Sequence, residues 1–428
     1  MRAIPNFSLR VACCAALLAA AAALPAQQDN QILDDDISTV QFQAGSRGLT
    51  FPIADLKAAN GTLVLQFDHA GDEIRDYVYT IVHCNSDWKP SDLTENEYID
   101  GFTEDRITDF QNSFNTLSAY THYTLALPSR NLRWSKSGNY LLKVFDNTDV
   151  DKVLVLVRRF CVVEPLWRID ARFVGTVAVS KMKTHHEIDF TVTPGTMRIP
   201  NPQNDVKAFV LQNGNWLDMI GPLPPYISRG EQLIYDYQDK IVFPAKKDWR
   251  LFDMRTFDVR GENIKSIVER PSWYEVTLRP DKSRADQPAQ NRGDINGRFS
   301  VENINLNQTL LQCDYAKVLF SVLRNMPYEE EDVYVFGELS DWQLKPEFKM
   351  EYSHEARAYV CEAWLKQGLY NYEYRVVNRQ TGAIDEEGLE GNWFETPNTY
   401  TILTYFRPFG ARFERLMGTS TIDSRFRQ

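Results

Sequence analysis

Histidine, cysteine and clustered carboxylates are the residues of this sequence with the most potential for catalysis. His83 and Cys84 precede Asp87, a grouping that could supply a thiol nucleophile and its base. Side chains adjacent on a strand point to opposite faces, so His83 and Cys84 would diverge, which favours a structural role. Residues 385–387 are three consecutive acids that could act as a glycoside hydrolase pair, although such a run between glycines is typical of a solvated turn. A hydrolase using either group is kept as one hypothesis.

Motifs for metals, nucleotides and activated serines give no candidate site. The sequence contains no GxSxG, HExxH, Walker A or GxGxxG pattern. His185 and His186 are neighbours on an expected strand and therefore cannot both reach one ion. We predict no catalytic, metal-binding or cofactor-binding residues, and no cofactor.

The composition narrows the class of protein. The chain has 428 residues, with 47 Lys and Arg against 58 Asp and Glu, and a net charge of −11. This acidic balance argues against a nucleic-acid partner, because binding phosphates requires Lys and Arg. Aromatic residues make up 12% of the chain, and together with short alternating apolar runs they favour β structure.

The first 26 residues have the features of a secretory signal peptide. Arg2 and Arg10 precede an apolar run, 11–24, that is too short to anchor the chain in a membrane. The sequence Leu24-Pro25-Ala26 predicts cleavage after Ala26. No later apolar run reaches ~18 residues, so we expect an exported protein without direct membrane insertion.

Four cysteines would remain in the mature chain: Cys84, Cys161, Cys313 and Cys361. In an oxidising compartment they allow three disulfide connectivities. The simplest pairs them within domains, as Cys84–Cys161 and Cys313–Cys361. The alternative, in which each thiol is a small buried apolar group on a strand, is equally compatible with the sequence.

Short strands bounded by Gly, Asn and Asp predict an all-β fold of tandem immunoglobulin-like or fibronectin-like sandwiches. A flexible acidic arm, 27–37, should precede the first sandwich, 38–165. An aromatic-rich insertion, 85–115, interrupts its regular spacing of strands. Residues 77, 79 and 81 should share one face of a strand. The strands of this sandwich are predicted at 39–43, 62–67, 77–83, 120–127, 140–145 and 153–163.

Two further domains are expected after Pro165, which cannot donate to a strand ladder. The second is β-rich and covers 166–309. Within it, residues 279–298 hold almost nothing to bury and are predicted to form a polar linker. The third covers 310–418 and is followed by a tail, 419–428. Their strands are predicted to begin at Ile169 and to continue at 187–192, 207–212, 231–237, 256–260, 266–268, 313–323, 333–336, 358–364, 368–377 and 399–406.

The third domain resembles the early-set β-sandwich found in glycogen-active enzymes and starch-binding modules. The resemblance rests on Gly337 with Ser340-Asp341-Trp342, and on the segment 366–374. Trp342, Trp364 and Trp393 could stack on sugar rings, so a periplasmic carbohydrate-binding protein is the alternative function. We favour a structural role, with Trp364 facing inward, and expect no sugar binding.

Segments along the whole chain together resemble the type IX secretion system plug protein family of Bacteroidota. The longest is YTIVHCNSDWKPSDLTENEYIDGF at 79–102. The resemblance implies a non-enzymatic periplasmic protein, held at the outer membrane through its partner. It would dock on the outer-membrane translocon barrel and seal its periplasmic opening. The other segments are NSFNTL at 112–117, YTHYT at 120–124, SGNYLLK at 137–143, RRF at 158–160, EP at 164–165, DING at 294–297, GNW at 391–393, TY at 399–400 and GAR at 410–412.

The 85–115 insertion is the segment expected to contact the barrel. Trp88, Tyr98 and Phe102 are the predicted anchors, because a few buried aromatic side chains dominate the energy of most interfaces. An intramolecular lid over the first sandwich is an equal alternative for this segment. The predicted polar rim of the contact consists of Asp92, Glu95 and Glu97.

Overall fold

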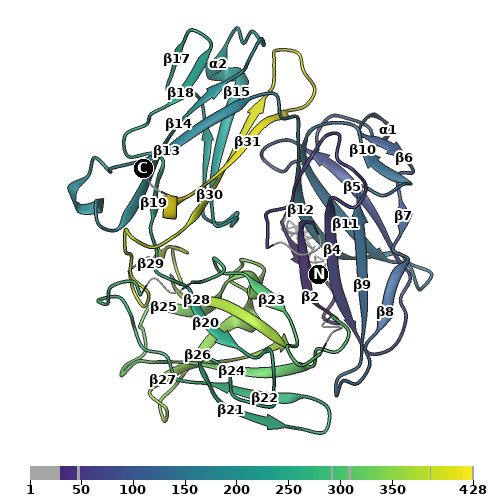
Figure 1. The fold of residues 1–428 in the computed structure, drawn as a ribbon, viewed down its shortest axis with the longest axis vertical. Coiled ribbons are helices and arrows are strands. Elements are labelled where there is room, and N and C mark those ends of the chain that lie inside the picture. Colours follow the sequence, from purple (N-terminus) through teal and green to yellow (C-terminus); the bar gives the residue numbers. More distant parts are fainter. Residues whose placement is uncertain (1–28, 46–48, 291–292, 307–309, 386, 427–428) are drawn as a thin grey trace, which may run out of the picture.

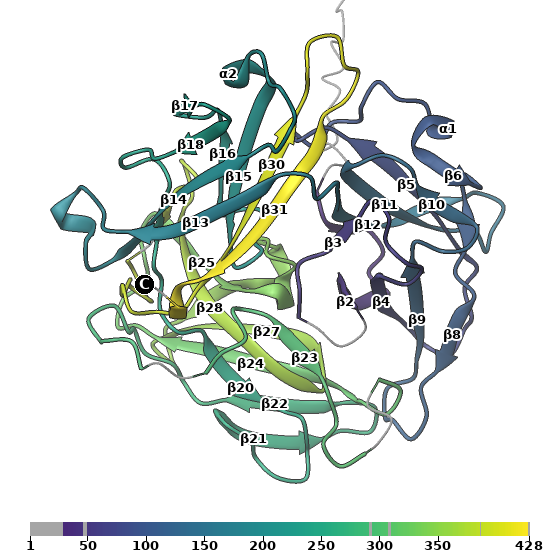
Figure 2. The ribbon, with the colours of Figure 1, turned by 45° about the horizontal axis from the view of Figure 1, so that its top comes forward.

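The computed structural model describes residues 29–426 except 46–48, 291–292, 307–309 and 386. The predicted signal peptide and its cleavage site lie outside these residues. Three β-rich units pack side by side, as Figures 1 and 2 show from two directions. The α-helices Glu95–Tyr98 (α1) and Pro202–Asp205 (α2) have four residues each. The predicted all-β architecture of several sandwiches is therefore confirmed.

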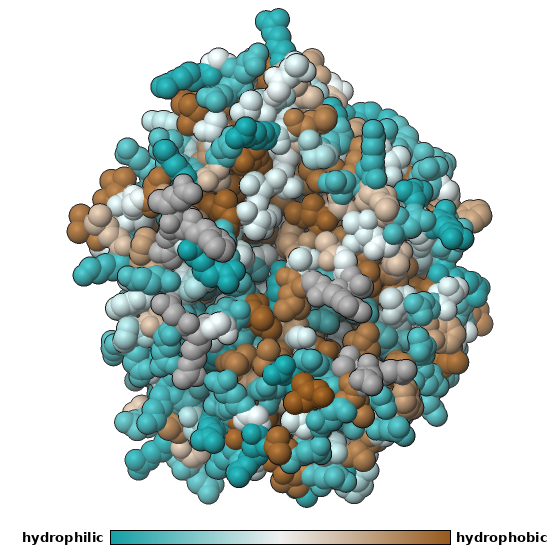
Figure 3. Space-filling model, in the orientation of Figure 1, coloured by the Kyte–Doolittle hydropathy of each residue, from teal (hydrophilic) through white to brown (hydrophobic). Residues whose placement is uncertain are grey.

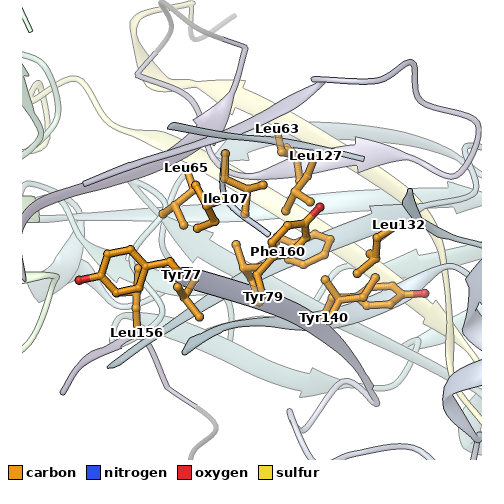
Figure 4. Packing of buried hydrophobic residues seen from close by; sticks show 14 of the residues in the cluster. Leu63, Leu65, Tyr77, Tyr79, Ile107, Leu127, Leu132, Tyr140, Leu156 and Phe160 are labelled. Atoms are coloured by element: carbon orange, nitrogen blue, oxygen red, sulfur yellow. The ribbon is translucent and has the colours of Figure 1, made fainter. Parts of the chain in front are cut away.

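The first unit is a β-sandwich whose two sheets enclose the aromatic core shown in Figure 4. Tyr77, Tyr79 and Ile81 share the inward face of one strand and are buried, as predicted. One sheet has the order β1-β12-β11-β5-β7 with β3 beside β12, the other has β2-β4-β9-β8, and β6 pairs with β10. The strands are β1 Gln31–Ile32, β2 Ile37–Ala44, β3 Ile53–Asp55, β4 Leu63–Ala70, β5 Tyr77–Cys84, β6 Ile99–Gly101, β7 Asp105–Arg106, β8 Asp109–Asn112, β9 Tyr120–Leu127, β10 Leu132–Trp134, β11 Gly138–Asp146 and β12 Val153–Val163.

The second unit is a sandwich assembled from two separate parts of the chain. Its sheets have the orders β13-β14-β18-β17, with β19 beside β14, and β16-β15-β30-β31. The last two strands come from the end of the chain and complete the second sheet: β30 pairs with β15, and β31 pairs with β30. The strands are β13 Arg168–Val174, β14 His185–Thr193, β15 Val206–Gln212, β16 Met219–Leu223, β17 Ile227–Arg229, β18 Gln232–Tyr235, β19 Val242–Pro244, β30 Thr399–Phe406 and β31 Arg415–Asp423.

The third unit lies in the chain between β19 and β30. Its ten strands form one sheet that folds back on itself, because Phe252 of β20 contacts Phe320 of β24 with ring centroids 5.6 Å apart. The strands are β20 Arg250–Asp253, β21 Ile264–Glu269, β22 Tyr274–Leu278, β23 Phe299–Val301, β24 Tyr315–Leu323, β25 Glu331–Phe336, β26 Lys349–Ser353, β27 Ala358–Lys366, β28 Gly368–Asn378 and β29 Ile384–Asp385.

The strand pairing corrects the boundaries expected for the second and third domains. β20 to β23 were expected in the second domain but pair within the third unit. β30 was expected in the third domain, and β31 reaches into the expected tail, yet both belong to the second unit. A boundary drawn along the sequence cannot reveal this insertion, because only long-range pairing defines the second sandwich. The strand expected at 256–260 does not form.

In two segments predicted to be flexible or solvated, the described residues, 29–37 and 279–298 without 291–292, are instead ordered parts of the fold. In the expected acidic arm, β1 pairs with β12 and the N–H of Leu33 donates to Val155. In the expected linker, the carboxylate of Asp281 accepts hydrogen bonds from Arg250 at 2.7 Å and from the Tyr372 hydroxyl at 2.7 Å. Polar residues of the linker form hydrogen bonds with buried polar groups of the third unit, and composition alone does not show this.

A buried carboxylate, Asp68 of β4, joins the first unit to the third. It accepts hydrogen bonds from Lys366 at 2.5 Å and from Tyr315 at 2.7 Å, both in the third unit, and pairs with His122 at 2.6 Å. Burial alone would raise the pKa of Asp68, but Lys366 and His122 outweigh it and hold the pKa below its ordinary value. Around this charge, Lys366 lies 3.9 Å from the centre of the Tyr120 ring.

An apolar interface joins the first unit to the second. Leu141 and Val157 on the outer face of the β12-β11-β5 sheet, with Trp88 from the turn after β5, cluster with Phe209 and Tyr405 of the second unit. The Tyr405 hydroxyl donates to Asn139 at 2.7 Å, so this polar atom is satisfied within the interface. Each sheet of this pair is thus covered on both faces, which explains its long apolar strands.

The four cysteines are free and buried, and the two predicted disulfides are wrong. Cys84 and Cys161 lie on β5 and β12, on either side of Asn139 in β11, and two strand spacings separate them by ~10 Å. Cys361 lies opposite Phe320 of β24. Phe320 is seven residues from Cys313, and seven residues of extended chain span more than ~20 Å. Burial raises the pKa of all four thiols to about 12, so they act as small apolar groups.

Replacing Lys366 by Met should weaken the junction of the first and third units. The substitution leaves Asp68 buried without its cation, which typically costs ~3–5 kcal/mol of unfolding free energy. Urea denaturation followed by tryptophan fluorescence would measure the loss. Lys317→Met is the matched control, because Lys317 is an exposed lysine paired with Glu362 at 3.7 Å and should change stability by less than ~1 kcal/mol. Equal effects of the two substitutions would contradict a structural role for Asp68.

Candidate partner-binding surface

The 85–115 segment leaves β5 through a turn that buries Trp88. The backbone of Trp88 is left-handed, with φ of 64°, and its N–H donates to Asn85. The indole packs edge-on against Trp216 of the second unit, with centroids 4.8 Å apart, beneath the Arg159 guanidinium. Trp88 therefore anchors the first unit to the second and is not an exposed anchor for a partner.

Tyr98 is also part of the protein's own core. Helix α1 begins with a capping box in which the Thr94 and Glu97 side chains and backbones bond reciprocally. This turn directs Tyr98 inward, where it is 4% exposed and its ring lies 6.1 Å from Tyr140. The prediction that Trp88 and Tyr98 are partner anchors is wrong for both, because Tyr98 packs in the core of the first sandwich and Trp88 packs between the first and second units. For Tyr98, the alternative of an intramolecular lid over the first sandwich describes the structure.

Phe102 remains exposed. It follows β6, and its N–H donates to Asn131 at 2.7 Å, which fixes the backbone while 65% of the residue stays accessible. Among the predicted rim residues, Asp92 and Glu95 are exposed and Glu97 is half-buried. The surface of the insertion therefore presents the Phe102 ring with carboxylates nearby in the chain, while a second exposed aromatic residue, Phe114, lies near the end of the segment.

Glu97 connects the insertion to a distant part of the chain. The Arg412 guanidinium donates to both carboxylate oxygens, at 2.7 and 3.0 Å, and also to the carbonyl of Asp92. These hydrogen bonds, with those from Thr94, lower the pKa of Glu97 to about 2. Arg412 belongs to the turn between β30 and β31, the yellow hairpin in Figure 1. The insertion and this hairpin therefore form one continuous surface.

The tip of that hairpin carries Phe409, which was not among the predicted anchors. Phe409 is fully exposed between Pro408 and Gly410, and Arg407 holds the turn by donating to the carbonyl of Ala411 at 3.1 Å. An aromatic residue at the centre of a Pro-Gly turn was the available signal, because turns lie on the surface. The candidate partner-binding surface consists of Phe102, Glu97, Arg412 and Phe409.

The residues considered for catalysis take structural roles. His83 is buried, with its ring nitrogens bonded to Ser91 at 2.8 Å and the Ser137 carbonyl at 3.0 Å, and burial lowers its pKa to about 4. Cys84 lies on the opposite face of β5, as the alternation predicted. Asp385 accepts the N–H groups of Glu387 and Gly388 and thereby forms a turn. Residue 386 lies outside the described part of the chain.

The adjacent histidines 185 and 186 each bond to groups of the protein itself. His186 bonds Tyr400 at 2.8 Å and the Phe394 carbonyl at 2.6 Å, while His185 bonds Thr184 at 2.8 Å. No group of three or more His, Cys, Asp or Glu among the described residues is placed to hold a metal ion. In the same part of the chain, no helix has the length and apolar character needed to cross a membrane.

The three tryptophans considered for sugar binding have separate neighbours. Trp342 packs against Trp249 with centroids 5.7 Å apart, and the backbone N–H of Trp393 donates to Lys246. Trp364 was predicted to face inward, which is wrong: it is 46% exposed and stacks on Tyr315. On β27 the inward positions are those of Cys361, Ala363 and Leu365, so Trp364 falls on the other face, at the border with the first unit.

A cavity of about 420 Å³ lies between the second and third units. At its wall, Asp218 of the second unit accepts hydrogen bonds from Lys246 and, at 2.8 Å, from Arg375 of the third unit. Burial would raise the pKa of Asp218, but the two cations hold it well below its ordinary value. Arg375 also bonds Glu373 at 2.8 Å, so the charges compensate one another and tie the two units together.

Comparison with known proteins agrees with this architecture. Residues 37–164, the first sandwich, match the family model described as type 9 secretion system plug protein 1st domain. The structure superposes on the crystal structure of a hypothetical protein from Parabacteroides merdae ATCC 43184 with a TM-score of 0.88 and 30% sequence identity. The alignment covers 92% of this chain and 99% of that chain. The chain belongs to the type IX secretion system plug protein family.

Two further comparisons add nothing to this assignment. The C-terminal domain of the Streptococcus agalactiae AgI/II polypeptide BspA aligns over 92% of this chain and 98% of that chain, with a TM-score of 0.16 at 7% identity. No curated protein matches the sequence. Members of the plug family are components of a secretion system, so we expect the function of this chain to lie in its contacts with other proteins.

Alanine substitution should distinguish Tyr98 of the insertion, which is buried, from Phe102, which is exposed. Tyr98→Ala removes a buried ring and should lower the free energy of unfolding by ~3–5 kcal/mol, whereas Phe102→Ala should change it by no more than ~0.5 kcal/mol. Thermal or chemical denaturation of the two variants measures the difference. A large loss for Phe102→Ala would show that its ring is packed rather than free.

Replacing Glu97 by Gln should loosen the β30–β31 hairpin. Arg412 would lose its charged partner, so amide hydrogen exchange across 407–414 should accelerate while the sandwich cores keep their protection. Because the pKa of Glu97 is depressed, the ion pair contributes its full stabilisation at pH values above the ordinary pKa of a glutamate. That stabilisation is lost as the pH falls through about 2, where Glu97 becomes protonated in the folded protein. The wild-type hairpin should therefore stay protected at pH 4, and early loss there would contradict the pairing.

Proposed function

We propose that this protein is a periplasmic plug that docks on the outer-membrane translocon of the type IX secretion system and seals its periplasmic opening. The observation that carries the proposal is the match of residues 37–164 to the first domain of the plug family. The fold of the remaining units supports it, because a seal must resist deformation by the channel and by its cargo.

Mutual contact of all three units supplies that rigidity. Asp68 with Lys366 joins the first unit to the third, the cluster around Tyr405 joins the first to the second, and Asp218 with Arg375 joins the second to the third. Each unit is thereby held by both others, so bending one interface requires breaking another. A rigid body loses little conformational entropy when it docks.

The candidate partner-binding surface suits reversible docking. Phe102 and Phe409 project from two segments that the Glu97–Arg412 ion pair holds together. Two exposed aromatic anchors within a polar surrounding provide specific contact without a large apolar face, which favours release as well as capture.

The test is capture of the solubilised translocon barrel by purified wild-type and variant plug. Phe102→Ala and Phe409→Ala should each weaken capture, since truncating an interface anchor costs ~2 kcal/mol or more, about 30-fold in affinity. Melting temperatures should stay unchanged. Tyr226→Ala is the control, because Tyr226 is an exposed aromatic residue in the second unit, near β17.

Two outcomes would count against the proposal at different levels. If the wild-type protein fails to retain the barrel, the docking role is wrong. If Phe102→Ala and Phe409→Ala capture the barrel as well as the wild type and the Tyr226→Ala control do, the contact lies elsewhere on the molecule and the candidate surface is wrong.

A further inference from the structure

A protruding apolar loop, residues 175–184, connects β13 to β14. It contains one turn of 3-10 helix, Val179–Lys181 (η1), and projects from the side of the second unit in both ribbon views. Val177, Val179 and Met182 are exposed by 56%, 81% and 51%. Figure 3 shows apolar side chains gathered at the edge of the molecule from which the loop extends.

The clustering of these side chains distinguishes the loop from ordinary exposed apolar residues. Single exposed valines are common on protein surfaces, but here three aliphatic side chains fall within six residues. An exposed tryptophan, Trp393, lies close by, because the N–H of its neighbour Phe394 donates to the carbonyl of Lys183 at 3.0 Å. Tryptophan is enriched where proteins meet the interface of a bilayer.

The charge of the loop is opposite to that of the protein as a whole. Lys183 is exposed and Lys181 is partly exposed, and no acid occurs between Val174 and Glu187, whereas the chain carries a net charge of −11. The acidic group that faces His185 at the base of the loop is Glu387. The apolar tip is thus accompanied by cations, while acids remain at the base.

The base of the loop is held by backbone hydrogen bonds. The N–H of Ala245 donates to Thr184 at 2.8 Å, and the N–H of Lys181 donates to Ala178 at 2.9 Å within the turn. The Thr176 hydroxyl donates to Ala178 at 3.2 Å. The exposed side chains are therefore presented in a defined arrangement, which lowers the entropic cost of inserting them.

We propose that the 175–184 loop inserts its apolar side chains into the interface of an anionic lipid bilayer. Aliphatic side chains flanked by lysines, with a tryptophan beside them, match the chemistry of an interfacial membrane anchor. The contact is additional to docking on a protein partner and needs no spanning segment. It would give the protein weak affinity for the membrane surface that surrounds such a partner.

Vesicle flotation tests the proposal with lipids alone. The full mature protein is mixed with phosphatidylcholine vesicles, with or without phosphatidylglycerol, and the bound fraction is measured. The wild type should bind the anionic vesicles, and its binding should fall with salt. Val179→Asp with Met182→Asp should reduce binding at least ~10-fold, because it removes apolar burial and adds negative charge. Replacing Lys181 and Lys183 by Ala should reduce it ~25-fold, about fivefold per lysine.

Val150→Asp is the matched control. Val150 is also a fully exposed loop valine, but it lies between Asp149 and Asp151, so the same substitution there should leave vesicle binding unchanged. Circular dichroism and melting curves establish that the variants are folded.

Either of two results overturns the lipid contact. One is absence of wild-type binding to anionic vesicles, and the other is undiminished binding of the loop variants. Loop variants that lose barrel capture while floating normally would mean that the loop contacts protein. Because the vesicles contain no translocon, a negative flotation result would not bear on the docking proposal, which barrel capture tests separately.

Discussion

The position of the first sandwich depends on one buried carboxylate, Asp68. A charge that is 1% exposed is tolerated only when its interactions replace water, and here Lys366, Tyr315 and His122 do so. Two of these three partners belong to the third unit, so the carboxylate is satisfied only when the two units are correctly docked. The interaction therefore specifies an orientation as much as it stabilises one. Trp364 stacks on Tyr315 at the edge of this cluster, which limits the access of water to it.

The insertion of the third unit into the second has the same effect at a larger scale. β30 can pair with β15, and β31 with β30, only after the chain has passed through ten strands of the third unit. The two units are consequently connected by two chain crossings and by the Asp218–Arg375 ion pair. With the apolar cluster around Tyr405, the three units support one another in pairs. A molecule built in this way is expected to move as one body, which suits the proposed sealing role.

The surface carries the features that distinguish one partner from another. Among the described residues, the four cysteines and most histidines and aromatic rings lie in cores and interfaces, as His83 and Trp88 illustrate. The exposed aromatic residues that remain on the first unit and the adjoining hairpin are few, and Phe102 and Phe409 lie on segments that a single ion pair connects. The 175–184 loop, on the second unit, is instead cationic and aliphatic. The two surfaces differ in chemistry and so are suited to different partners.

The sequence by itself determined the strand content, the shared face of Tyr77, Tyr79 and Ile81, and the family, because periodicity and ordered motifs are local properties. It also indicated that His83 and Cys84 diverge. Only the tertiary structure decided which unit each strand joins, since β30 acquires its place from β15, which lies far earlier in the chain, and β31 then pairs with β30. The same holds for the free cysteines, whose separation across β11 depends on sheet order. It holds as well for Trp88 and Tyr98: an aromatic residue in a polar segment looks the same in sequence whether it faces a partner or its own core, and burial, which decides between them, is a property of the assembled fold.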